Sequence, residues 1–162
     1  MAIRILKEVS RDGGRLPTTG KAAVIAGQPL ELGTNGASVH GWEGNADILV
    51  FGLASDSNVT QPLQGAGGLT VGVGYDYTNF NRGGLIGAFM NGGVFELYND
   101  GTGNPFETAA AFTLNKAVYA NAGSGLLSDV AGGAGGMVVG ACMGVTNSGS
   151  ATAMKLQLKL TI

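Results

Sequence analysis

The chain has little charge. Its 162 residues include nine Lys or Arg and 11 Asp or Glu, so charged residues make up 12% and the formal net charge is −2. That share is about half the usual one for a soluble domain, and nothing in it resembles the basic surface of a nucleic-acid binder. Two interpretations remain open: a small protein kept soluble by Asn, Thr, Ser and Gln, or one whose surface other subunits cover.

Cysteine and histidine are each present once, as Cys142 and His40. A single cysteine excludes an internal disulfide, and its Gly, Ala and Met neighbours predict a small buried hydrophobe. A zinc site usually needs several His, Cys or carboxylate ligands, so no metal site and no cofactor are expected.

His40 is the first candidate for catalysis, with Ser38 and Glu43 nearby in the sequence. A histidine base needs a nucleophile and an orienting acid brought together by the fold, and the chain has no Gly-x-Ser-x-Gly elbow. We therefore expect no enzyme, and a His40 that lies in a loop and packs beside Trp42 or at a subunit contact. A hydrolase that uses His40 is the alternative.

Long apolar runs are missing as well. No run approaches the length of a membrane span, and the first ten residues lack the apolar core of a signal peptide. The expectation is a protein made in a cytoplasm that stays soluble or joins an assembly, with no membrane partner.

The most regular pattern is at the C-terminal end, in residues 154–162. Met154, Leu156, Leu158, Leu160 and Ile162 alternate with polar residues. Side chains of a strand point alternately to opposite faces, so this pattern predicts a strand with one buried and one exposed face.

Further strand patterns, separated by turn signals every eight to twelve residues, predict an all-β fold. We expect a compact β-barrel or sandwich of about ten short, mostly antiparallel strands. Residues 85–90 and 93–98 flank Asn91-Gly92, which predicts a hairpin. In residues 137–145, Met137, Val139, Ala141, Met143 and Val145 are expected to share one face.

Residues 1–20 are predicted to be an N-terminal strand and extended arm, and residues 21–162 a single domain with a possible inserted subdomain at 78–112. The first strand could pair within the domain or add to the sheet edge of a neighbour. Trp42 and the aromatic loop around Tyr75, Tyr77 and Phe80 suggest core or interface contacts, or alternatively a glycan-binding module.

The C-terminal third supports a family comparison. The segment Lys116–Asp129, which contains Ala-Val-Tyr-Ala and Gly-Leu-Leu, is followed by Val138–Val145 and then by the alternating strand. This order resembles the small β-barrels of tailed-bacteriophage virion proteins, particularly capsid decoration (cement) proteins. Gly27–Leu32 and Phe51–Asp56 are similar to segments of such proteins too.

The resemblance implies a noncatalytic protein that binds the outside of a phage capsid and bridges subunits of the major capsid protein. It would be located on the virion exterior and form a homo-oligomer, with a trimer favoured because capsid lattices offer three-fold sites. A tail-tube or tail-completion protein is the related alternative. The residues predicted to form its interfaces are Ile3, Ile5, Leu6, Val9, Trp42, Tyr77 and Phe80.

Overall fold

The computed structural model describes most of the C-terminal half and shorter stretches before it. The described residues are 3–7, 10–11, 16–17, 24–33, 38–44, 48–55, 87–90, 92–99, 104–107, 109–150 and 152–162. Two interface candidates in the aromatic loop, Tyr77 and Phe80, lie outside these ranges, as does Val9.

The described residues form strands and no helix. The twelve strands are β1 (Ile3–Lys7), β2 (Ser10–Arg11), β3 (Leu16–Pro17), β4 (Pro29–Leu32), β5 (Ser38–Gly41), β6 (Gly52–Ala54), β7 (Ala88–Met90), β8 (Val94–Tyr98), β9 (Ala117–Ala120), β10 (Leu127–Ser128), β11 (Met137–Thr146) and β12 (Lys155–Leu160). The predicted all-β class is therefore confirmed.

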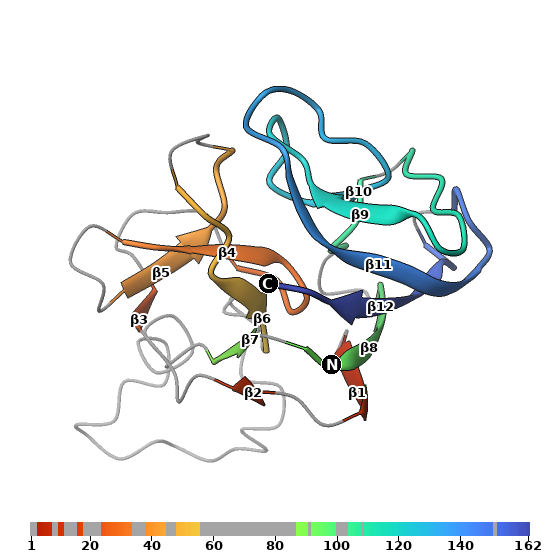
Figure 1. The fold of residues 1–162 in the computed structure, drawn as a ribbon, viewed down its shortest axis with the longest axis horizontal. Helices are drawn as coiled ribbons and strands as arrows, with labels where there is room; N and C mark the ends of the chain where they lie inside the picture. The colour runs from red at the N-terminus through yellow and green to blue at the C-terminus, as the bar shows by residue number, and fades with distance from the viewer. Residues whose placement is uncertain are drawn as a thin grey trace, which may run out of the picture.

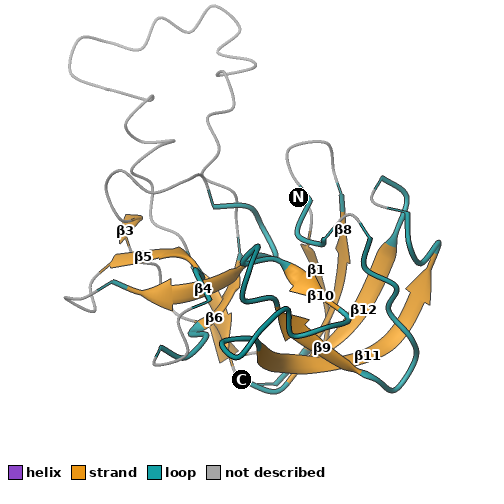
Figure 2. Ribbon diagram, turned by 90° about the horizontal axis from the view of Figure 1, so that it is seen from above, coloured by secondary structure: helices purple, strands orange, loops and turns teal. Residues whose placement is uncertain are grey.

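The strands belong to two six-stranded sheets (Figure 1). One has the order β1-β8-β12-β11-β9-β10 and the other β2-β7-β6-β4-β5-β3. Among these strands the pairing is antiparallel except between β3 and β5, which run parallel. In Figure 2 the long β11 and β12 lie on one side of the molecule, and β4, β5 and β6 on the other.

The C-terminal strand has the predicted alternation. In β12 the side chains of Leu156, Leu158 and Leu160 are buried, whereas those of Lys155, Gln157 and Lys159 are exposed. The strand lies inside its sheet, between β8 and β11. Its buried face therefore contributes to the largest cluster of apolar side chains in the described core.

That core cluster includes residues of both sheets. Ile3, Phe95 and Leu156 come from the first sheet, and Leu53 and Phe89 from the second. The rings of Phe89 and Phe95 are 5.0 Å apart between centroids, within the usual range for a favourable aromatic pair. A smaller cluster of Val24, Leu30, Val39, Ala54 and Ala88 belongs to the second sheet and the segment before it.

The hairpin predicted around Asn91-Gly92 is wrong. β7 and β8 occur close to the expected residues, but β7 pairs with β6 and β2, while β8 pairs with β1 and β12. Gly92 and Gly93 both have positive φ angles, of 86° and 81°, which glycine adopts readily. Within residues 78–112, β7 therefore belongs to one sheet and β8 to the other.

The face predicted for residues 137–145 is also wrong in part. Val139 and Cys142 are both buried, and Met143 is exposed. The register of β11 shifts between Val138 and Gly140 against β9, and between Cys142 and Gly144 against β12. An extra residue in one strand reverses the faces beyond it, which explains why strict alternation fails here.

The N-terminal segment pairs with strands of its own chain. β1 forms the edge of the first sheet against β8, β2 pairs with β7, and β3 pairs with β5. Of the two pairings that the sequence left open for the first strand, the structure shows the one within the chain. Removing residues 2–15 would therefore remove two edge strands, β1 and β2, together with the buried Ile3, rather than a detached arm.

Candidate functional site

The candidate site is a cluster of Glu31, His40 and Glu43 around strands β4 and β5. The two strands are antiparallel, and Glu31 lies directly opposite His40 in their register. Residues directly opposite on paired strands present their side chains on the same face. Because Leu30 and Val39 alternate with them, Glu31 and His40 lie on the other face from the smaller apolar cluster.

The chain reaches Glu43 just beyond the end of β5, where glycines allow two backbone segments to meet. Gly44 has a φ of 80°, and a Cβ placed on it would lie 2.0 Å from the carbonyl oxygen of Ala122. A Cβ on Gly125 would lie 2.1 Å from the carbonyl oxygen of Trp42. Only glycine permits such close approach, so residues 42–44 are held against the turn between β9 and β10.

The three side chains differ in burial. Glu31 is 3% exposed and His40 7% exposed, whereas the side chain of Glu43 is 53% exposed. A buried carboxylate is costly unless it is paired and hydrogen-bonded. Glu31 meets this requirement with two contacts: Oε1 lies 3.0 Å from His40 Nε2, and Oε2 accepts a hydrogen bond of 3.1 Å from the backbone N–H of Glu43.

Both ring nitrogens of His40 have oxygen neighbours. Nδ1 donates to the carbonyl oxygen of Gly41 at 2.8 Å, and lies 3.9 Å from Oε1 of Glu43. Nε2 faces Glu31. One ligand atom from each of the three residues fits within a mutual separation of 4.8 Å, which is close enough to hold a metal ion.

The sequence did not predict this cluster. It placed Glu43 near His40, but it missed Glu31, which is nine residues away along the chain. The sequence feature that could have revealed Glu31 is the turn-forming segment Gly33–Gly36, which lies between two short strand patterns. Pairing those patterns across the turn would have placed Glu31 beside His40. The expectation of no metal site rested on the scarcity of His and Cys, and it did not count carboxylates from a neighbouring strand.

Among the side chains that the structure describes, no nucleophile contacts the ring of His40. In this part of the chain the ring nitrogens of His40 lie close to oxygen atoms of Glu31, Gly41 and Glu43. A histidine base acts on a nucleophile within hydrogen-bond distance. The described contacts instead surround the imidazole with oxygen atoms, an arrangement that holds a proton or a cation.

Two of the residues predicted to form interfaces are buried inside the single chain. Ile3 and Trp42 are each 2% exposed within the single chain and belong to its core, so the structure gives them a packing role. Ile5 is opposite Phe95, and Leu6 lies at the register shift of β1. An interface role for these residues stays a prediction.

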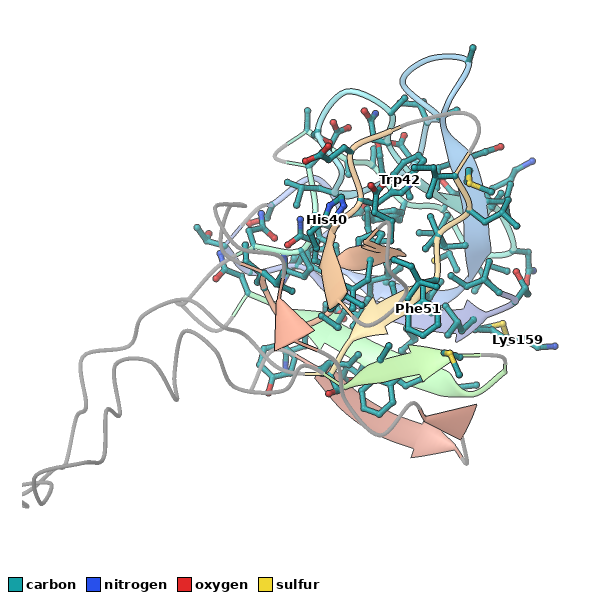
Figure 3. All side chains as sticks on the ribbon, turned by 90° about the vertical axis from the view of Figure 1, so that its left-hand side faces the viewer. His40, Trp42, Phe51 and Lys159 are labelled. Carbon is teal, nitrogen blue, oxygen red and sulfur yellow. The ribbon has the colours of Figure 1, made fainter. Side chains whose placement is uncertain are left out.

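Trp42 directly follows β5, the strand that contains His40, and both residues are labelled in Figure 3. Its indole Nε1–H is buried and has no hydrogen-bond partner among the described residues. His40 is buried as well, but it lies on strand β5, so the loop position expected from the sequence is wrong.

Comparison with known proteins gave no assignment. No protein-family model matches the chain, and no curated protein sequence matches it. The described residues also contain no helix that is long and apolar enough to cross a lipid bilayer.

Proposed function

We propose that the chain is a noncatalytic structural protein of a phage virion, which binds the outside of the capsid lattice and bridges subunits of the major capsid protein. The observation that carries this proposal is a surface that combines sparse charge with exposed large apolar side chains. Among the described residues these are Leu49, Leu114, Val130, Val138 and Met143, each 44–72% exposed. Burying such side chains against another protein is favourable.

The sequence resemblance to decoration proteins supports the major capsid protein as the partner of this surface. A protein of this kind stabilises a capsid by burying area across the seams between subunits, and a standard interface hides about 1,600 Å² in total. Repetition over a lattice makes even modest contacts strong, since each bound copy raises the effective concentration of further contacts. In this proposal the two sheets form one closed sandwich or barrel, and three copies assemble at a three-fold position.

The structure favours an assembly role over a glycan-binding module. Stacking on a sugar requires an exposed aromatic face, but Trp42 is buried in the core. The other residues that suggested glycan binding, in the Tyr75–Phe80 loop, lie outside the described residues. A tail-tube or tail-completion protein differs only in the assembly that it joins, and the location on the particle separates the two.

Co-sedimentation of the purified chain with capsids tests the proposal. We expect saturable binding that Leu49→Gln and Leu114→Gln weaken, because each replaces an exposed apolar side chain with a polar one. Lys155→Gln, on the exposed face of β12, is the matched control and should bind normally. An absence of capsid binding by the folded wild-type chain would contradict the proposal.

A further inference from the structure

The geometry around His40 requires a positive charge between two acceptors. A carbonyl oxygen has no proton to give, so Nδ1 of His40 must carry the hydrogen that bonds to Gly41. In the neutral ring Nε2 then presents its lone pair, and it lies 3.0 Å from Oε1 of Glu31. Two acceptors at that distance repel each other unless a proton or a metal ion lies between them.

The contact of Nδ1 is the one that metal-binding histidines usually have. A histidine that ligates a metal through one nitrogen donates its other N–H to a backbone carbonyl or carboxylate, which fixes the tautomer and the ring orientation. His40 has this arrangement with Gly41. A tetrahedral ion holds two ligands that are each about 2.1 Å away at about 3.4 Å from each other, so the 3.0 Å between Nε2 and Oε1 has to widen by only about 0.4 Å.

The formal charge of the cluster and the exposure of Glu43 to solvent also suit the binding of a cation. With His40 neutral, the two carboxylates give the cluster a formal charge of −2, equal and opposite to that of a divalent ion. Glu31 and His40 are buried, so an ion between them would be shielded from water on that side. Glu43 is half exposed and lies at the solvent side, where it can complete the site together with water.

We propose that Glu31, His40 and Glu43 bind one divalent transition-metal ion, with Zn²⁺ as the best fit. The ligand atoms would be Nε2 of His40 and one carboxylate oxygen each from Glu31 and Glu43, with Glu43 turning about its side-chain bonds to reach the ion. Imidazole with carboxylates suits zinc and similar ions, whereas Ca²⁺ and Mg²⁺ prefer sites made of oxygen alone. The ion would tie β4, β5 and the following loop together and so stabilise this part of the fold.

Titration of the metal-free chain with Zn²⁺ is the direct test. The full-length protein is used without a histidine tag and after treatment with a chelator. Calorimetry should show one ion per chain. Thermal unfolding should shift upward by about 5–10 °C when free Zn²⁺ exceeds the dissociation constant 100-fold. The same concentration of Mg²⁺ should give a much smaller shift.

Variants separate this site from adventitious binding. Glu43→Gln changes an exposed residue, so the fold should persist, and we expect zinc affinity to fall at least about tenfold. Asp129→Asn removes the same charge outside the cluster and should leave the affinity unchanged. His40→Asn should abolish binding, but Glu43→Gln is the decisive variant because it does not disturb a buried pair.

Nitrogen NMR gives a readout at a single residue, because His40 is the only histidine. We expect Zn²⁺ to shift Nε2 strongly, while Nδ1 keeps its proton and its hydrogen bond. Absence of heat and of any thermal shift, with both nitrogens protonated throughout, would overturn the proposal in favour of an ion pair between His40 and Glu31. Equal zinc affinity in the wild type and Glu43→Gln would overturn it as well.

Discussion

Asn121 shows how a single polar side chain can hold a turn together. It is buried at the end of β9, and its Oδ1 accepts hydrogen bonds from the backbone N–H groups of Gly123 and Ser124 at 2.8 and 3.3 Å. Its Nδ2 donates to Glu107 at 3.2 Å, and Ser124 Oγ donates to the same carboxylate at 2.7 Å. The side chain therefore links the β9–β10 turn to the segment that precedes β9.

Replacing Asn121 should destabilise the protein. In Asn121→Ala the backbone N–H groups of Gly123 and Ser124 lose their acceptor and Glu107 loses a donor, at about 0.5–1.5 kcal/mol for each hydrogen bond. Asn121→Asp keeps the acceptor but places a second carboxylate beside Glu107, so it should be destabilised too. Urea unfolding measures both, and the exposed Thr152→Ala should change the unfolding free energy by less than about 0.5 kcal/mol. A stability of Asn121→Ala equal to that of Thr152→Ala would show that this network contributes nothing.

Cys142 should be chemically protected in the native protein. Burial raises the pKa of its thiol above the ordinary value of 9.0, and a weaker opposing contribution comes from a hydrogen bond with the backbone of Gly144. Since the thiolate is the reactive form, we expect a disulfide reagent to label Cys142 only as the protein unfolds in denaturant. Complete labelling within minutes without denaturant would refute the buried placement.

The same raised pKa predicts a pH dependence of stability. Well below pH 9.0 the thiol is protonated in both the folded and the unfolded chain, so it causes no change of stability with pH there. As the pH rises further, the unfolded chain ionises first, and stability falls until the folded thiol also ionises. The unfolding free energy of the wild type should therefore fall more steeply above pH 9.0 than that of Cys142→Ala. Parallel curves for the two proteins would contradict this.

Among the elements, β12 is the strand on which the first sheet depends most. It lies between β8 and β11, and its buried leucines meet the core shared by both sheets. Figure 3 shows the neighbouring Lys159 directed away from the molecule. The strand thus offers adjacent positions with opposite environments.

Substitutions at those adjacent positions should differ widely. Leu158→Ala opens a cavity at a fully buried site and should reduce the unfolding free energy by about 2–5 kcal/mol. Lys159→Ala removes an exposed side chain and should change it by less than about 0.5 kcal/mol. Chemical denaturation of the two variants measures the difference. Similar losses in both would mean that β12 does not have the faces described.

The elements also show what sequence pattern can predict. Alternation in β12 is local, so the buried face of residues 154–162 could be read directly. The pairing partner of a strand is a non-local property, and for that reason Asn91-Gly92 predicted a hairpin where the chain changes sheets. In β11 the register shifts depend on β9 and β12, which the strand's own residues do not encode. The Glu31–His40 pair was missed for the same reason.

At the scale of the whole molecule, composition predicted the class but not the arrangement. Frequent turn signals and short alternating segments indicated an all-β chain, and the described residues form two sheets with a shared core. The sparse charge agrees with a surface that other subunits cover, and the exposed apolar side chains give that surface candidate contacts. The assembly proposal therefore rests on the composition of the surface, and it involves no catalytic site.

Electron cryomicroscopy of phage particles incubated with the purified chain tests the central proposal most directly. The account predicts density that fits the two sheets on the outer capsid surface, above seams between major capsid subunits and repeated with the symmetry of the lattice. Density for the chain in the tail alone, or its absence from the particles, would contradict the account.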